Sequence, residues 1–377
     1  MRVVLDARYA GPRPSGIGNY VRPLGARLPK LLPHASFRYW IREGTEPLSA
    51  ASNVQHVPVN AVPAGLASLL WPARLDDFEE GDVFHAPANI LGFGLPRASV
   101  VTVHDVMWIE HLAWCQPRPY LRPISKAYYT TGIRRALRSA ARILTVSKAS
   151  ADAIRRVEPS AAARTVVTPN ACEPHFKPAA EPERARELAA RCIGSDEPYF
   201  LVVGQNQPSK GHAYAVAAFA EAALESHRLV LVQRLESGRG LHALCERLGI
   251  AQRVTFAESL PFEALLALLQ SATALVQPSL AEGFGLPVLE AIAAGCPVLA
   301  SDIPPFREIL GQVGLFSSPT NVGELAQNMR TAAAEPALLS ELSARGLERA
   351  KSFDWDRTAQ LTAEVYAEVA RGNRARV

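Results

Sequence analysis

The sequence of 377 residues lacks the features that mark several other classes of protein. Its five cysteines are scattered and form no Cys-x-x-Cys pair, so neither a disulfide framework nor a zinc or redox motif is indicated. We expect reduced thiols in a cytoplasmic protein. Charged residues, Gly or Pro interrupt every apolar run well short of the ~18 residues of a membrane-spanning helix. Asp6 ends the first apolar run after three residues, which is not the pattern of a signal peptide.

Short apolar runs, typical of buried strands, alternate instead with helical patterns. We expect strands at 3–5, 82–86, 99–105, 142–147, 199–204, 228–233, 254–258, 274–279 and 297–301. Strands that alternate with helices predict parallel sheets covered on both faces. Residues 172–198 are rich in Pro, Glu and Ala and are expected to form a linker. The sequence therefore predicts an α/β protein built from two successive units.

The two halves of the chain differ in charge. Residues 1–175 hold 21 Lys and Arg against 13 Asp and Glu, whereas the remainder holds 19 against 23. Between Cys115 and Thr165 there are 11 basic and 2 acidic residues. A basic half suggests an anionic partner, such as phosphate, nucleic acid or a membrane surface.

One part of the basic half, residues 124–142, has a helical pattern. Arg134, Arg138 and Arg142 follow one another at intervals of four and would lie near one helix face. The plainer interpretation is the solvated face of a packed helix. The sharper one is reversible contact with an anionic membrane.

The segment "PSLAEGFGLPVLEAIAAG" at 278–295 carries the strongest chemical signal. Pro287 is expected to be the first residue of a helix that runs to Gly295. The preceding glycines let the backbone approach a ligand, and the free N–H groups of a helix start favour an anion. Glu282 and Glu290 are poor phosphate ligands but good acceptors for the hydroxyls of a sugar and a ribose. This combination indicates a nucleotide sugar; an ordinary helix with solvated glutamates is the alternative.

Further motifs occur in order over most of the chain. They are "SGIGNY" (15–20), "TVHD" (102–105), "LTVSKASADAI" (144–154), "VVTPNACEPHFKP" (166–178), "LVVGQNQPSKG" (201–211), "QPSLAEGFGLPVLEAIAAGCPVLASD" (277–302), "REILGQVGLF" (307–316) and "FDW" (353–355). With them the sequence resembles the family 4 retaining glycosyltransferases of the GT-B fold. The "DAR" and "GIGNY" at its start are most similar to bacterial enzymes of O-antigen and exopolysaccharide synthesis, including mannosyltransferases.

The resemblance implies two Rossmann-like domains that face each other across a central cleft. Residues 1–175 plus 356–377 would form the N-terminal, acceptor-binding domain, with the C-terminal helix crossing back onto it. Residues 176–355 would form the C-terminal domain, which binds the nucleotide-sugar donor.

The implied activity is transfer of a hexose, above all mannose from GDP-mannose, to a hydroxyl of a glycan or lipid-linked glycan. The anomeric configuration would be retained by front-face attack. A UDP-sugar donor is the alternative within this class. A non-catalytic GT-B module that binds a partner is the alternative from another class. A nicotinamide oxidoreductase is disfavoured, because Val21 leaves the G-x-G-x-x-G pattern incomplete.

The resemblance assigns two catalytic residues, one from each half. His104 would lie next to the donor sugar and donate to a hydroxyl or to developing charge; a structural His-Asp turn is the plainer alternative. Glu282 would contact the hydroxyls of the donor sugar.

The other assigned residues would bind the donor. Ser209 and Lys210 are both assigned to the donor, and Lys210 would neutralise the departing diphosphate. Ser209 stands where the family commonly has an arginine, and Arg234 is the substitute that the sequence offers for that charge. Glu290 would accept from the ribose. Backbone N–H groups would hold sugar and phosphate at Gly16, Gly18, Gly283, Phe284, Gly285 and Leu286. Plainer alternatives are an ordinary turn at the first two glycines and a surface lysine at 210.

The family works without a metal ion, so we expect no metal and no other cofactor. The sequence has no Asp-x-Asp motif, and "LDD" at 75–77 is interpreted as solvated surface. The expected partners are the nucleotide sugar and its glycan acceptor, with no nucleic acid. The expected location is the cytoplasm, with possible attachment to the inner face of the membrane.

Overall fold

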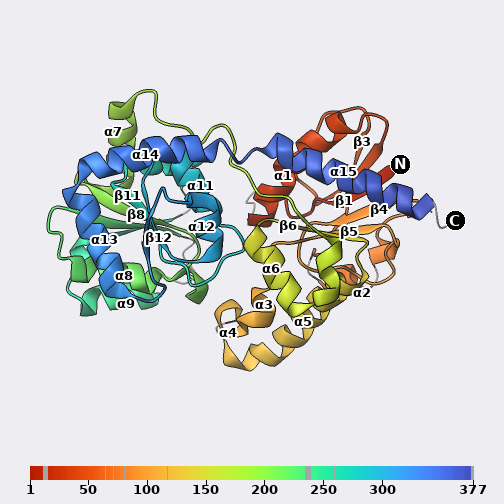
Figure 1. The fold of residues 1–377 in the computed structure, drawn as a ribbon, viewed down its shortest axis with the longest axis horizontal. Coiled ribbons are helices and arrows are strands. Elements are labelled where there is room, and N and C mark those ends of the chain that lie inside the picture. Colours follow the sequence, from red (N-terminus) through yellow and green to blue (C-terminus); the bar gives the residue numbers. More distant parts are fainter. Residues whose placement is uncertain are drawn as a thin grey trace. The chain divides into compact units, whose positions relative to one another are not determined.

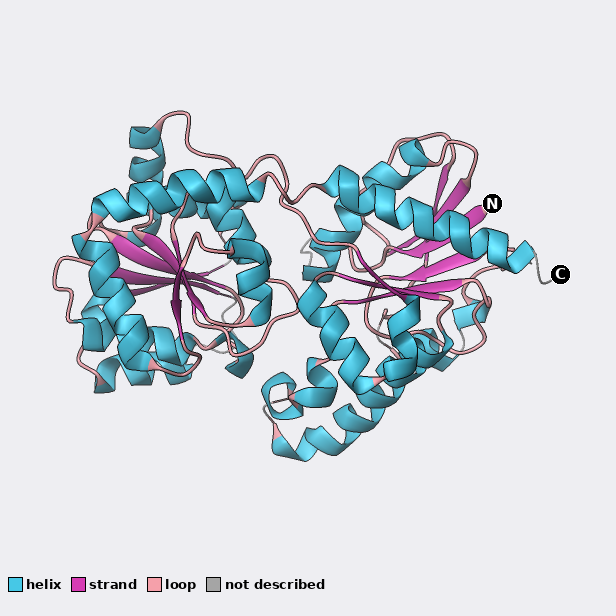
Figure 2. Ribbon diagram, in the orientation of Figure 1, coloured by secondary structure: helices cyan, strands magenta, loops and turns pink. Residues whose placement is uncertain are grey.

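The computed structural model describes residues 1–11, 16–63, 65–70, 72–79, 81–116, 118–233, 239–258 and 260–374. The chain forms two units, Met1–Ala171 with Asp354–Val377, and Cys172–Phe353 (Figure 1). Each unit has a parallel sheet with helices packed around it, which confirms the predicted α/β class (Figure 2). In the described ranges, no helix has the length and apolar character needed to cross a bilayer.

The first unit is built on a seven-stranded sheet in the order β3-β2-β1-β4-β5-β6-β7. Its strands are β1 (Arg2–Asp6), β2 (Ser36–Ile41), β3 (Val54–Pro58), β4 (Val83–Ala86), β5 (Ser99–Val103), β6 (Arg142–Thr145) and β7 (Thr165–Val167). Its helices are α1 (Gly16–Leu31), α2 (Leu66–Leu70), α3 (Met107–Glu110), α4 (Leu112–Cys115), α5 (Arg122–Ser139), α6 (Lys148–Val157) and α15 (Trp355–Arg374). The central strands β4 and β5 are wholly buried, because a parallel sheet is covered on both faces.

The second unit is built on a six-stranded parallel sheet in the order β10-β9-β8-β11-β12-β13. Its strands are β8 (Tyr199–Val203), β9 (Arg228–Gln233), β10 (Val254–Glu258), β11 (Ala274–Gln277), β12 (Val298–Ser301) and β13 (Leu315–Ser317). Its helices are α7 (Pro182–Ile193), α8 (His212–Ala222), α9 (Arg239–Arg247), α10 (Phe262–Ser271), α11 (Leu286–Ala293), α12 (Pro304–Leu310), α13 (Val322–Ala334) and α14 (Pro336–Ala350).

The strands at 36–41, 54–58, 165–167 and 315–317 were not expected from the sequence. β2 carries Arg38 among its aromatic residues, and β3 lies at a sheet edge where polar Gln55 and His56 can be tolerated. β7 and β13 have only three residues each, too few to show a pattern. Strand pairing in the folded sheet decides such elements.

The expected linker at 172–198 is wrong in its middle, where α7 forms. Pro182 occupies the first turn, and Gly194 ends the helix in a left-handed conformation. Ala185, Ala189 and Ile193 recur every four residues, are buried, and face the packing partner α10. Their small side chains made this apolar stripe inconspicuous in the sequence.

The acidic "LDD" segment also differs from expectation, because Asp76 is not solvated. Only 2% of its side chain is exposed, and Arg38 lies 2.5 Å from one carboxylate oxygen. Trp40 Nε1 donates to the other oxygen at 2.8 Å. Asp76 therefore joins its loop to β2 as a buried, paired charge.

The C-terminal helix α15 packs along α1 in the first unit, as the resemblance implied (Figure 1). Residues at helical spacing on one face of α15, including Ala359, Ala363 and Tyr366, are buried. Arg27 of α1 pairs with Asp356 at 2.7 Å. About 180 residues of chain separate these two parts of the unit, so the contact is purely tertiary.

Gly211 has no Cβ, and this allows its backbone to lie very close to the Pro278 carbonyl. Its φ is +68°, and a Cβ there would lie 2.0 Å from the Pro278 carbonyl oxygen. Gly194 has a similar φ of +71°, but its Cβ would meet no atom within 4 Å. We expect Gly211→Ala to lower the free energy of unfolding by about 2–5 kcal/mol, through left-handed strain plus overlap.

Gly194→Ala is the matched control and should cost only about 1 kcal/mol, because it adds strain without overlap. Urea unfolding of the two variants, with both changes in the same unit, makes the comparison. Equal losses would show that the Gly211–Pro278 approach is absent.

Candidate active site

Two loops meet at the carboxyl ends of β8 and β11, as parallel strands require. The Leu280 N–H donates to the Ser209 carbonyl at 2.7 Å, and Gly211 lies against Pro278. Ser209 is buried with 2% of its surface exposed. It therefore joins the loops through its backbone and does not occupy the place of a phosphate-binding cation.

Lys210 and Glu282, which follow these two strands, form an ion pair. The ammonium Nζ lies 2.8 Å from Oε1 and 2.7 Å from Oε2 of the carboxylate. The Glu282 side chain is 7% exposed and that of Lys210 is 24% exposed. An ionised carboxylate so deeply buried requires a partner, and Lys210 supplies it. The two residues predicted to contact different parts of one ligand thus contact each other.

Ser279 and Gln277 extend the ion pair into the core. Ser279 Oγ donates to Glu282 Oε1 at 2.8 Å, and Gln277 Nε2 donates to Ser279 Oγ at 3.1 Å. Both side chains are buried. Sequence reasoning missed them, although Ser279 stands three residues before Glu282 in the quoted segment. Their hydrogen bonds hold the Glu282 carboxylate in one orientation.

Helix α11 begins at Leu286, one residue earlier than expected, after Gly285 at φ +118°. A Cβ at Gly285 would lie 2.6 Å from a ring carbon of Phe306, so only glycine fits. Phe284 is buried and packs against Phe353 with ring centroids 5.8 Å apart. The Phe284 side chain is thus structural, so Phe284 can contact a ligand through its backbone alone.

Glu290 lies on the second turn of α11 and is half-buried. Burial raises the pKa of its carboxyl to about 7. No hydrogen-bond donor from the described part of the chain pairs with this carboxylate. Both of its oxygens therefore keep acceptor capacity that the described residues do not use, whereas the oxygens of Glu282 each accept at least one hydrogen bond.

His104 follows β5 in the first unit and is held on three sides. Its backbone N–H donates to Asn89 Oδ1 at 2.8 Å, and Ser150 Oγ donates to its carbonyl at 2.8 Å. Its Nε2 lies 2.8 Å from the Pro87 carbonyl, which can only accept. Nε2 therefore carries the ring proton, and Nδ1 is the acceptor nitrogen.

Burial lowers the pKa of His104 to about 4, so the ring is neutral at pH 7. Its only ring N–H is engaged by the Pro87 carbonyl, whereas the expected role of His104 needs an N–H free to donate. The side chain can instead accept a hydrogen bond from a hydroxyl. Asp105 beside it accepts from the Met107 N–H at 3.0 Å at the start of α3.

The remaining predicted residues are placed differently from expectation. Gly16 and Gly18 lie in the first turn of α1 and not in a loop. Arg234 and Ser15 lie outside the described residues. Arg142 begins β6 after α5 has ended, and it pairs with Glu368 of α15.

Arg138 is also paired, at 2.6 Å from Glu158. Two of the three arginines predicted to form one cationic helix face are thus neutralised by carboxylates. The stripe of Arg134, Arg138 and Arg142 does not exist as a free basic surface.

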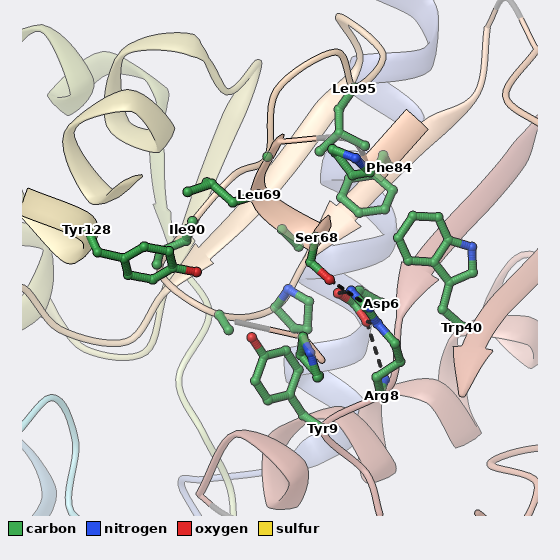
Figure 3. Close-up of a pocket in the computed structure, with 16 residues that line it drawn as sticks. Asp6, Arg8, Tyr9, Trp40, Ser68, Leu69, Phe84, Ile90, Leu95 and Tyr128 are labelled. Atoms are coloured by element: carbon green, nitrogen blue, oxygen red, sulfur yellow. Dashed lines mark hydrogen bonds and ion pairs between the residues drawn. The ribbon is translucent and has the colours of Figure 1, made fainter. Parts of the chain in front are cut away.

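A small pocket lies at the carboxyl end of β1, where the "DAR" motif falls (Figure 3). Arg8 pairs with Asp6 at 2.6 Å and donates to Ser68 Oγ at 2.9 Å and to the Ala61 carbonyl at 2.7 Å. The pocket is partly open, and its volume of about 30 Å³ has room for a water molecule. Sequence reasoning did not assign these residues, and their contacts join β1 to the 61–68 segment.

Among the residues described, no three His, Cys, Asp or Glu side chains are grouped so as to hold a metal ion.

Comparison with known families gives a match in each unit. Residues 184–350 match the model of the glycosyl transferases group 1, and residues 15–171 match the glycosyl transferase 4-like domain. The first match includes the loops that carry Lys210 and Glu282 and the helix α11 that carries Glu290.

Individual relatives match over most of the chain. The O-antigen chain mannosyltransferase B of Escherichia coli is 30% identical over 308 residues, 79% of this chain and 78% of that protein. The D-inositol 3-phosphate glycosyltransferase of Streptomyces bingchenggensis is 27% identical over 401 aligned positions, 95% of this chain and 86% of that protein. The structure of sucrose-phosphate synthase from Thermosynechococcus elongatus superposes with a TM-score of 0.77 at 21% identity, over 99% of this chain and 100% of that one.

The environment of His104 generates a spectroscopic prediction. We expect ¹⁵N NMR of the histidine rings to show the Nε2–H tautomer at neutral pH and a titration midpoint near pH 4. The unfolded chain takes up the proton near pH ~6.5, so this residue makes the free energy of unfolding fall as the pH drops from there to about 4. His104→Gln identifies the signal. A midpoint near ~6.5, or an Nδ1–H tautomer, would contradict the geometry.

Proposed function

The chain belongs to the family 4 glycosyltransferases, and we propose that it transfers mannose from GDP-mannose. The proposed acceptor is a hydroxyl of a glycan or lipid-linked glycan, and the anomeric configuration is retained. The observation that carries this proposal is the ion pair of Lys210 and Glu282 beside the start of α11, with Glu290 one turn further on. The mannosyl donor rests on the name of the Escherichia coli relative, and a UDP-sugar is the alternative.

Lys210 is proposed to bridge Glu282 and the donor diphosphate. An ammonium has three N–H donors, and two of them serve the Glu282 oxygens. The third can point to a phosphate oxygen, because Lys210 keeps part of its surface exposed. Together with the backbone N–H groups at the start of α11, it would stabilise negative charge on the leaving group.

Glu282 has one acceptor position left for the donor sugar. Oε1 receives both Lys210 and Ser279, whereas Oε2 receives Lys210 alone. We assign the second lone pair of Oε2 to a hydroxyl of the donor sugar. For His104 we propose that Nδ1 accepts from a sugar hydroxyl. Glu290 would accept from the ribose.

In the proposed reaction the bond between C1 of the sugar and the diphosphate oxygen breaks as the acceptor oxygen bonds to C1 on the same face. The acceptor proton passes to the departing phosphate. The step therefore needs no protein nucleophile. The residues supply orientation and charge stabilisation.

Ligand screening tests the proposal directly. Thermal shift with GDP, UDP and ADP should select GDP, since a ligand that binds the native state raises the melting temperature. ¹H NMR of the product from GDP-mannose should show the anomeric configuration of the donor. Selective binding of UDP would favour the alternative donor class, and an inverted product would exclude the proposed mechanism.

Variants at the ion pair separate binding from turnover. We expect Glu282→Ala to lower kcat by about 100-fold while GDP binds as well or better, because Lys210 is no longer neutralised. Lys210→Ala should weaken GDP binding by about tenfold. Isothermal titration and steady-state kinetics measure both effects. Weaker GDP binding in Glu282→Ala would mean that the carboxylate does not compete with phosphate for Lys210.

The raised pKa of Glu290 predicts a pH dependence of donor binding. Ribose hydroxyls donate to the ionised carboxylate, so the affinity for GDP-mannose should rise as the pH increases towards about 7 and then level off. GDP-mannose suits the test because its diphosphate, esterified at both ends, does not titrate near neutrality. The change should approach tenfold per pH unit below the pKa and vanish in Glu290→Gln. The same profile in both proteins would remove Glu290 from the ribose site.

We also propose reversible contact with anionic membranes, through a different surface from the predicted arginine stripe. This surface, named the 118–126 surface, presents Arg118, Tyr120, Ile124 and Lys126. Tyr120 is 71% exposed and Ile124 is 70% exposed. No Asp or Glu occurs between residues 111 and 151, so anionic headgroups meet no opposing charge along this segment.

Vesicle co-sedimentation tests this contact at low and high salt. We expect binding to anionic but not neutral lipid, weakened by salt, and lost in Tyr120→Ser/Ile124→Ser. Val62→Ser/Leu66→Ser is the control, since those side chains are 63% and 65% exposed elsewhere in the unit. Equal binding to both lipids, or equal loss in both variants, would remove the 118–126 surface.

A further inference from the structure

A buried hydrogen-bond network links four elements of the first unit. His85 on β4 bonds through Nδ1 to the Tyr366 hydroxyl at 2.6 Å and through Nε2 to Thr102 Oγ1 at 2.7 Å. Thr102 on β5 also bonds to the Tyr20 hydroxyl at 3.0 Å. All four side chains are fully buried. The network therefore runs from α15 through the sheet to Tyr20 on α1.

The network ends at the ring of His104. The rings of Tyr20 and His104 pack edge to face, with centroids 5.1 Å apart and an interplanar angle of 89°. Trp355, the first residue of α15, packs on Tyr20 from a centroid distance of 6.1 Å. An edge-to-face pair has a preferred orientation, so a fixed Tyr20 also fixes the His104 imidazole.

We propose that Tyr20 is a positioning residue for His104, and that α15 holds Tyr20 through Tyr366, His85 and Thr102. This inference rests on the proposed role of His104 as an acceptor for a sugar hydroxyl. Pro87 fixes one ring nitrogen, and Tyr20 fixes the tilt of the ring. The C-terminal helix then supports a catalytic residue from which it is separated by about 250 positions of sequence.

Ordinary core packing does not account for these side chains. An apolar core needs no hydroxyl or imidazole, and burying such groups costs free energy unless each is hydrogen-bonded. Here two tyrosines, a histidine and a threonine from four elements bond to one another. Such a satisfied network gives a defined orientation rather than extra stability.

The test uses the full chain and graded variants. Tyr20→Leu removes the ring next to His104, Tyr20→Phe removes only its hydroxyl, and Tyr366→Phe releases α15 from His85. Tyr39→Phe is the matched control, because Tyr39 is a buried tyrosine of the same unit whose hydroxyl donates to the Gly25 carbonyl at 2.9 Å.

We expect Tyr20→Leu to lower kcat about tenfold or more, with the KM for the donor little changed. Tyr20→Phe and Tyr366→Phe should lower kcat less, in that order. In Tyr20→Leu, the NMR titration midpoint of His104 should move up from about 4, because water reaches the ring. Tyr39→Phe should leave both kcat and this midpoint unchanged. The NMR readout does not depend on activity.

His104→Ala distinguishes failure of the proposed role of His104 from failure of the positioning role of Tyr20. If it keeps full turnover, the role of His104 fails, and the positioning role of Tyr20 fails with it. If it is inactive while Tyr20→Leu matches Tyr39→Phe in kcat and midpoint, only the positioning role is overturned. Tyr20 would then be a packing residue.

Discussion

Parallel strand pairing is the constraint on which the described structure depends. Every described pairing in the two sheets is parallel, so each strand must be followed by a crossover that returns the chain to the same starting edge. The helices that make these crossovers bury both faces of each sheet, which is why the central strands β4 and β5 are buried along their whole length. The same constraint gathers the loops after the strands along one edge. Lys210 and Glu282 become neighbours in this way, although 72 residues separate them.

The ion pair of Lys210 and Glu282 reduces the positive charge that this loop offers to a ligand. With Ser209 in the place of an arginine, Lys210 is the cation that this loop provides, and Glu282 already binds it. The pair is neutral, so a diphosphate at the proposed site would meet the remaining ammonium N–H of Lys210 and the N–H groups at the start of α11. The proposed chemistry therefore rests on preorganised backbone dipoles as much as on side-chain charge.

The candidate catalytic residue of the first unit, His104, differs from Glu282 because it carries no charge and forms no ion pair among the described residues. It is held by Pro87, Asn89 and Ser150. Burial keeps the proton off the imidazole, so its chemistry is that of a fixed acceptor. Rigid support matters more here than charge, and the buried network from α15 provides it through Tyr20.

Local pattern in the sequence determined the α/β class, nine of the described strands and the segment around Glu282 and Glu290. Those features depend on apolar runs, glycine and proline, whose effects act over a few residues. Motif resemblance added the family and the return of α15. Tertiary structure alone decided the rest. Helix α7 forms where a linker was expected, Asp76 is buried, and Arg142 lies on β6 and not on the expected helix. Lys210 pairs with Glu282, and the ring N–H of His104 binds the Pro87 carbonyl. Each of these outcomes depends on which distant groups meet and how far water is excluded from them, and neither is written in local spacing.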